Sequence, residues 1–267
     1  MNQNEKVATE PDLSYDQIIL VGDSLTQNGI APNGWATLLA TEYTRKMDVI
    51  ARGFSAYTTH WMRPLVAPLL RPIVTQNTRL VTLLLGSNDS TLPGLSNQHV
   101  PIAKYKENLR AIVGTIVALA PQTKVLVITP PPLAARKCWE EYEFDSVKAY
   151  REACAEVGHE LAQSNTSIGL LDTWPLFVPG RNYDLPEFDP ASLQHLTVED
   201  RLHLGQEGNR LLAQGVLDSI KTLWPELASE NVIPRVPLNW AEYPSFLNSE
   251  SLGNNGLINQ LYVNARK

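Results

Sequence analysis

Val21-Gly22-Asp23-Ser24-Leu25-Thr26-Gln27 follows the apolar run Ile18-Ile19-Leu20 and precedes a polar segment, 28 to 34, that contains two glycines. This order predicts a buried strand that ends in a tight turn and brings the Ser24 hydroxyl out of a sheet. Open α/β sheets bind ligands at the carboxyl ends of their strands, so a serine at the end of the first strand is well placed to be a nucleophile. A serine beside Gly and Asp is also ordinary turn chemistry. The interpretation of Ser24 therefore depends on the residues downstream.

Composition and charge narrow the class of protein. The 267 residues are enough for one large α/β domain, and 43% hydrophobic with 19% charged residues is typical of a globular chain. The net charge of -6 and the lack of a basic cluster disfavour nucleic acid and anionic membranes as partners. Residues 1–12 lack the pattern of a signal peptide, and no apolar run reaches the about 20 residues that cross a bilayer. Cys138 and Cys154 form no metal spacing or disulfide framework, so we expect a cytoplasmic protein, with Cys154 as a buried thiol.

Apolar periodicity predicts alternating strands and helices. Short apolar runs predict strands at 18–20, 47–51, 80–85, 124–129 and 168–171. Helical spacing predicts helices at 35–46, 102–119, 145–164 and 206–223, and Asp145 is the expected cap of the third. The proline-broken region 61–74 is interpreted as an irregular or short helix, and 174–199 as a loop over the sheet edge or active site. This alternation predicts a three-layer α/β/α sandwich with a five-stranded parallel sheet.

The predicted domain is flanked by two segments. A polar N-terminal segment covers 1–14, the α/β domain 15–224, and a C-terminal arm 225–267. Prolines between 225 and 244 indicate an extended arm, and a short helix near its end has an apolar stripe made of Leu257, Ile258, Leu261 and Tyr262. Such a short helix is not stable alone in water. We expect it to dock on the neighbour in a homodimer, or alternatively on its own domain.

The segment before the last predicted helix carries what a nucleophilic serine needs. A serine hydroxyl is activated by a histidine that takes its proton, usually with a carboxylate that orients the histidine. Asp200 and His203 lie three residues apart before a helix start, so both can approach Ser24. Oxyanion donors are also needed, and Gly53 and Asn88 each follow a predicted strand end, on the same edge as Ser24.

Other polar residues leave alternatives open. His195, five residues before Asp200, is the rival base, while His60 and His99 lie in loops from which they could touch substrate. A metal centre is the other alternative, with candidate ligands Asp89, Asp172, Asp189 and His203. No His-x-x-x-His or carboxylate-dense pattern supports it, so we expect no metal and no cofactor.

The order of these residues resembles a known family. The strings Gly22-Asp23-Ser24-Leu25, Gly53, Gly86-x-Asn88-Asp89 and Asp200-x-x-His203-Leu204 resemble the four blocks of the SGNH hydrolases, also called GDSL esterases. The resemblance covers about 15–224. Finer features look like the isoamyl acetate-hydrolysing esterase branch: Asp23 to Gln27, Ala51 to Ser55, Thr129 to Pro132 and His203-Leu204-Gly205-x-x-Gly208-Asn209. That branch often has Ala where this chain has Ser87, which leaves the Gly-x-Asn-Asp pattern intact.

The resemblance implies a flavodoxin-like fold and a set of roles. Ser24 is then the nucleophile, His203 the base and acid, and Asp200 its orienting partner. The N–H groups of Ser24 and Gly53 and the side chain of Asn88 form the oxyanion hole. The implied activity is a cofactor-independent serine esterase that hydrolyses small acetate-type esters through an acyl-enzyme.

Three other functions remain in view. A thioesterase or lysophospholipase on the same scaffold differs only in loop shape, and a non-catalytic ligand-binding protein could retain the fold. The α/β-hydrolase alternative is weaker, because the chain has no Gly-x-Ser-x-Gly elbow. Aromatic residues at Phe54, Tyr57 and Trp61 favour an acyl or alkyl pocket, although aromatics after a strand are more often core.

Overall fold

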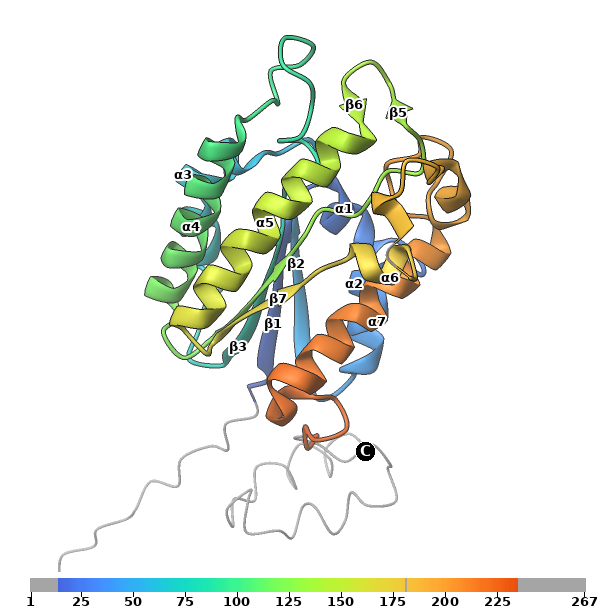
Figure 1. Ribbon diagram of the computed structural model, residues 1–267. Coiled ribbons are helices and arrows are strands. Elements are labelled where there is room, and N and C mark those ends of the chain that lie inside the picture. Colours follow the sequence, from blue (N-terminus) through green and yellow to red (C-terminus); the bar gives the residue numbers. More distant parts are fainter. Residues whose placement is uncertain (1–13, 181, 235–267) are drawn as a thin grey trace, which may run out of the picture.

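A parallel sheet forms the centre of the computed structural model, which describes residues 14–180 and 182–234 (Figure 1). Its order is β2-β1-β3-β4-β7. The strands are β1 (Asp16–Gly22), β2 (Met47–Gly53), β3 (Thr78–Leu84), β4 (Lys124–Ile128) and β7 (Ile168–Leu171). All neighbouring pairs are parallel, so the five carboxyl ends meet at one edge. The predicted three-layer sandwich with a five-stranded parallel sheet is confirmed.

Helices cover both faces of this sheet (Figure 1). They are α1 (Ser24–Gln27), α2 (Trp35–Glu42), α3 (Thr59–Leu70), α4 (Ile102–Leu119), α5 (Phe144–Ser164), α6 (Trp174–Phe177) and α7 (Gln206–Leu223). One core packs under α2, α6 and α7, and the other under α3, α4 and most of α5. In β1, Ile18 and Leu20 enter the first core while Ile19 and Val21 enter the second. Because strand side chains alternate, a strand covered on both faces must be apolar throughout.

The region 61–74 is more regular than its prolines suggest. It forms α3, a continuous helix of 12 residues with Pro64 and Pro68 inside. Both prolines are exposed, whereas Met62, Val66 and Leu70 are buried in the second core. The missing proline N–H groups therefore lie on the solvent side, and the buried apolar face outweighs the lost hydrogen bonds. The sequence therefore predicted a helix in the right place, and the expectation that it would be irregular or short was wrong.

Two further expectations need correction. The N-cap of α5 is Glu143, with no side-chain hydrogen bond, and Asp145 lies inside the first turn. The segment 174–199 is also not a plain loop, because it contains α6 and the 3₁₀ helices Asn182–Asp184 and Pro190–Leu196. Pro175 sits near the start of α6, where a missing N–H costs nothing. Pro175 and Pro190 thus lie in the first turns of short helices.

A small hairpin lies between β4 and α5 and was not predicted. Strands β5 (Lys137–Cys138) and β6 (Tyr142–Glu143) pair antiparallel. Figure 1 places this hairpin at the same end of the sheet as α1. Cys138 and Cys154 are both buried, as expected for Cys154. Within the described residues, no helix combines the length and apolarity needed to cross a membrane.

The first residues of the predicted arm pack on their own domain. A 3₁₀ helix covers Pro225–Leu227, and Leu227 and Ala228 are buried. The Tyr43 hydroxyl donates to the Leu227 carbonyl at 2.8 Å, and Lys221 pairs with Glu230 at 2.6 Å. The expected helix around 257–262, and with it the homodimer contact, lies outside the described residues.

Candidate active site

Ser24 begins α1 directly after the end of β1. A Cβ at Gly22 would lie 2.1 Å from Thr26 Oγ1 and 2.6 Å from the Leu84 carbonyl, so the strand-to-helix turn requires glycine. Asp23 caps α1, because its carboxylate accepts the Leu25 N–H at 2.9 Å. The turn places Ser24, 6% exposed, at the carboxyl edge of the sheet.

Three predicted residues meet there in what we term the contact chain, Ser24–His203–Asp200. His203 Nε2 lies 2.8 Å from Ser24 Oγ, and His203 Nδ1 lies 2.6 Å from Asp200 Oδ2. The other carboxylate oxygen accepts the backbone N–H groups of Leu202 at 2.9 Å and His203 at 2.8 Å. Arg201 between them has φ 65°, a left-handed turn conformation. The turn therefore holds Asp200 and His203 side by side, as their spacing predicts.

Hydrogen bonds keep Asp200 ionised. Burial alone would raise the pKa of its carboxyl group, but the bond to the His203 ring and the two backbone N–H bonds outweigh it, and the pKa lies below its ordinary value. The turn itself is fixed by the Val198 N–H, which donates to the His203 carbonyl at 2.9 Å. A negative charge is thus held next to the imidazole.

Asn88 and Gly53 reach the same edge. Asn88 is 4% exposed, and its Nδ2 donates to the Tyr57 carbonyl at 2.9 Å. Its Oδ1 accepts the Tyr142 hydroxyl at 3.0 Å. A Cβ at Gly53 would lie 2.0 Å from the Gln27 nitrogen, so the backbone of β2 touches α1 only because this residue is glycine. Gly53 therefore lies against α1, which begins at Ser24, and Asn88 follows β3, the strand that pairs with β1.

Two buried carboxyl groups lie beneath this edge. Asp23 and Asp89 are both 0% exposed, and burial raises the pKa of each to about 7. Asp89 accepts the N–H of Thr59 at 3.0 Å and also its hydroxyl. Asn108 donates to the same hydroxyl at 3.2 Å. Asp89 thus ties the loop after β3 to the first turn of α3.

The rival histidines lie elsewhere. His195 is exposed, and its Nδ1 lies 3.0 Å from the Ser192 carbonyl. His99 Nδ1 lies 2.5 Å from the Thr91 carbonyl. His60 lies in the first turn of α3 and not in a loop, and it lines a pocket of about 710 Å³ together with Tyr57, Trp61 and neighbouring residues. Of the five histidines, His203 is the one that the structure brings to Ser24.

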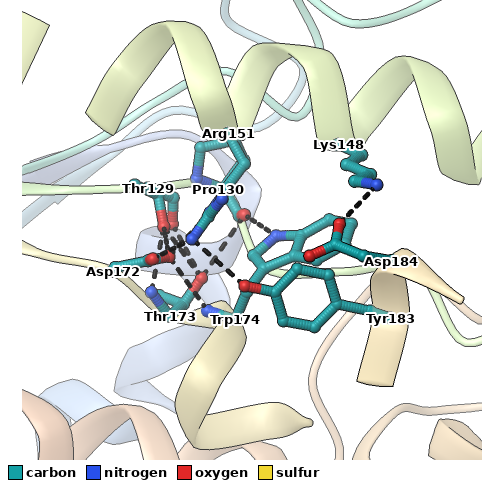
Figure 2. Close-up of polar contacts among 9 residues, drawn as sticks. All are labelled: Thr129, Pro130, Lys148, Arg151, Asp172, Thr173, Trp174, Tyr183 and Asp184. Carbon is teal, nitrogen blue, oxygen red and sulfur yellow. Dashed lines mark hydrogen bonds and ion pairs between the residues drawn. The ribbon is translucent and has the colours of Figure 1, made fainter. Parts of the chain in front are cut away.

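The carboxylates that the sequence offered as metal ligands each bind a different side chain or backbone group instead of one another. Asp172 pairs with Arg151, whose Nε donates to Oδ1 at 2.9 Å, as Figure 2 shows. Arg151 also donates to the Tyr183 hydroxyl at 3.3 Å, and Lys148 pairs with Asp184 at 2.6 Å. Within residues 14–180 and 182–234, no group of His, Cys, Asp or Glu is arranged to hold a metal ion. The Asp172–Arg151 pair instead fastens the segment after β7 to α5 (Figure 2).

Sequence reasoning missed the contribution of the β5–β6 hairpin. Trp139 is 53% exposed, and its ring centroid lies 6.5 Å from that of His203 and 5.6 Å from that of Tyr142. Tyr142 contacts Asn88. The hairpin thus lies beside His203 through Trp139 and beside Asn88 through Tyr142. The only signal of this in the sequence was a pair of aromatic residues three positions apart.

Comparison with known proteins gives the family. The model of the GDSL-like lipase/acylhydrolase family matches residues 20–211. The isoamyl acetate-hydrolyzing esterase 1 homolog of Rattus norvegicus is 32% identical over 256 residues, covering 91% of this chain and 94% of that protein. Its Mus musculus counterpart is 33% identical over 226 residues, covering 79% and 84%. A carbohydrate acetylesterase from Sinorhizobium meliloti shares the fold, with a TM-score of 0.58 at 18% identity over 78% of this chain and all of that one. The resemblance found in the motifs is confirmed: the chain belongs to the GDSL-like lipase/acylhydrolase family and is a carboxylic ester hydrolase.

Proposed function

We propose that this enzyme hydrolyses small carboxylic esters of the acetate type through an acyl-enzyme formed on Ser24. The observation that carries the proposal is the contact chain, with distances of 2.8 Å and 2.6 Å from Ser24 Oγ through His203 to Asp200. Relatives named for isoamyl acetate hydrolysis, 32% and 33% identical, support the acetate-type substrate.

In the first half-reaction, His203 Nε2 takes the Ser24 hydroxyl proton while Ser24 Oγ attacks the ester carbonyl carbon. Asp200 holds the Nδ1–H, which keeps Nε2 free to accept, and its charge stabilises the imidazolium that forms. The carbon–oxygen bond to the alcohol then breaks, and Nε2 returns the proton to the leaving oxygen. Water attacks the acyl-Ser24 ester in the same way, releasing the carboxylic acid and restoring Ser24.

The oxyanion needs donors on the side of the carbonyl away from His203. We assign this role to the backbone N–H groups of Ser24 and Gly53 and to the Asn88 side chain. Asn88 has two N–H bonds, and the Tyr57 carbonyl occupies one. The other remains to bind the oxyanion. Burial of Asn88 keeps water from competing for this bond.

The alcohol part of the ester leaves on the His203 side, since that residue protonates it. Trp139 lies beside His203 with half of its side chain exposed. An exposed indole next to the leaving group offers an apolar face on which an alkyl alcohol can be desolvated. This contact supports small alkyl acetates as substrates.

A substrate panel tests the proposal. It contains isoamyl acetate, p-nitrophenyl acetate, butyrate, octanoate and palmitate, an acyl-coenzyme A thioester and a lysophospholipid. The proposal predicts the highest kcat/KM for the acetates. A preference for the thioester, the lysophospholipid or palmitate would assign the enzyme to the thioesterase or lysophospholipase alternative. No turnover of any of them would favour a non-catalytic binding protein.

A further inference from the structure

Tyr142 connects the β5–β6 hairpin to the amide of Asn88. Its hydroxyl donates to Asn88 Oδ1 at 3.0 Å, and the two residues are 3% and 4% exposed. The hairpin is itself anchored, because the Leu92 N–H donates to the Glu141 carbonyl at 2.8 Å. The segment that leads into it is held by the Ala134 N–H, which donates to the Arg201 carbonyl at 2.9 Å. The phenol thus reaches Asn88 from an element tied to the loops on both sides of the site.

The two partners of the Asn88 amide define its orientation. The Tyr57 carbonyl can only accept, so it selects the end of the amide that carries nitrogen. Rotating the amide by half a turn would set Oδ1 against that carbonyl. The Tyr142 hydroxyl holds the opposite end, which fixes the plane of the group. The second N–H of Asn88 takes part in neither contact. Its direction is fixed by the hydrogen bonds to Tyr57 and from Tyr142, because together they fix the plane of the amide.

We propose that Tyr142 is a positioning residue for the oxyanion hole, and that its hydroxyl aims the second N–H of Asn88 at the oxygen of the reacting carbonyl. The inference rests on the proposed function, in which Asn88 donates to the oxyanion. A donor stabilises the transition state in full only when it is already oriented before charge develops. Donation from Tyr142 to Oδ1 also polarises the amide and strengthens its N–H as a donor.

The environment of Tyr142 keeps it in the donating form. Burial raises the pKa of its hydroxyl well above the ordinary value, with the charges of Asp23 and Glu141 adding to the effect. The phenol therefore stays protonated throughout the pH range of ester hydrolysis. A donor that never ionises is suited to a fixed positioning contact.

Tyr142→Phe removes the hydroxyl and keeps the ring, and Tyr43→Phe is the matched control. Tyr43 lies in the same core, is 0% exposed, and donates to the Leu227 carbonyl at 2.8 Å away from the site. We expect Tyr142→Phe to lower kcat by about 10-fold with KM within about twofold, less than the loss of a whole donor. Tyr43→Phe should leave kcat within about twofold of the wild type.

A double-mutant cycle with Asn88→Ala separates positioning from packing. If Tyr142 acts through Asn88, adding Tyr142→Phe to Asn88→Ala should change kcat by less than about twofold. An equal loss in both backgrounds overturns the proposal, as does a Tyr142→Phe enzyme that behaves like Tyr43→Phe.

Binding of a trifluoromethyl ketone, which forms a tetrahedral adduct carrying an oxyanion, provides a second measurement. Its affinity should fall with kcat/KM in Tyr142→Phe and stay unchanged in Tyr43→Phe. Circular dichroism at the assay temperature verifies that each variant is folded. An unfolded Tyr142→Phe would overturn a role limited to positioning. A wild type that hydrolyses no ester overturns the proposed function and this inference together. An active wild type whose kcat falls about 10²- to 10³-fold in Asn88→Ala confines the test to Tyr142.

Discussion

Replacing Asp89 by Asn should change how the stability of the protein depends on pH. Asp89 is fully buried, and burial raises its pKa from 3.8 to about 7 despite the hydrogen bonds from Thr59. Asn has the same shape, and its Oδ1 can accept the Thr59 N–H and hydroxyl, both of which reach the same Asp89 oxygen. The substitution therefore removes the ionisation and keeps most of the packing.

The sign and size of the effect follow from linkage. The folded pKa is the higher one, so between about pH 4 and pH 7 the native state binds more protons than the unfolded state. The contribution of Asp89 to the free energy of unfolding is thus fully present below pH 3.8 and is lost as pH rises through about 7. At about 1.4 kcal/mol per pKa unit, the whole loss is about 4 kcal/mol. Between pH 5 and pH 8 it is about 2.5 kcal/mol.

Urea unfolding of the wild type and Asp89→Asn at pH 5 and pH 8 measures this quantity. We expect the stability difference between the two proteins to move by about 2.5 kcal/mol in favour of the variant from pH 5 to pH 8. Any pH-independent cost of the substitution cancels in this comparison. A difference that is the same at both pH values would refute the reasoning, because an Asp89 that is stabilised as a carboxylate is ionised in both states throughout this range.

The remaining predictions concern the site. Asn88→Ala should lower kcat by about 10² to 10³-fold with a smaller change in KM, measured on p-nitrophenyl acetate, because one oxyanion donor is lost; a rise in KM alone would make Asn88 a ground-state contact. His203→Ala should lower kcat by about 10⁴-fold or more, whereas exposed His195→Ala should stay within about twofold. The reverse ranking would transfer the base role to His195. Trp139→Ala should lower kcat/KM for isoamyl acetate about fivefold more than for methyl acetate, the equivalent of about 1 kcal/mol of apolar contact. Equal losses on both esters would remove Trp139 from the alcohol site.

The architecture was predictable because its signals are local. Buried strands are short apolar runs, and the apolar residues of the covering helices recur with a period of 3.6. The bounds of α4, β7 and α7 therefore agree with the predicted ranges. The helix α3 was not predictable from its prolines, since whether they face solvent depends on where the sheet lies. Strands β5 and β6 have two residues each, too few for any periodic pattern.

The contact chain could be anticipated for a similar reason. Asp200 and His203 are three residues apart, so a single turn brings them together, and a parallel sheet delivers Ser24 to the same edge across 179 residues of sequence. His195 has nearly the same neighbourhood in sequence, yet it faces solvent from a 3₁₀ helix.

The contact between Tyr142 and Asn88 spans 54 residues and joins an unpredicted hairpin to a loop. No local pattern carries such a contact, because it exists only after both elements have packed. A contact of this kind is found only from the structure, whereas residues that lie close together in the chain, such as Asp200 and His203, can be found from the sequence.

Covalent labelling of Ser24 tests the central claim most directly. The wild type, Ser24→Ala and Ser55→Ala are incubated with a serine-directed phosphonate, and the adduct is located by peptide mass spectrometry while acetate hydrolysis is followed in parallel. Ser55 is an exposed serine in the loop after β2, which makes it the matched control. We expect one adduct per chain on Ser24 in the wild type and in Ser55→Ala. Ser24→Ala should show no adduct and a loss of turnover by orders of magnitude. An adduct on another residue, or full esterase activity in Ser24→Ala, would contradict the account.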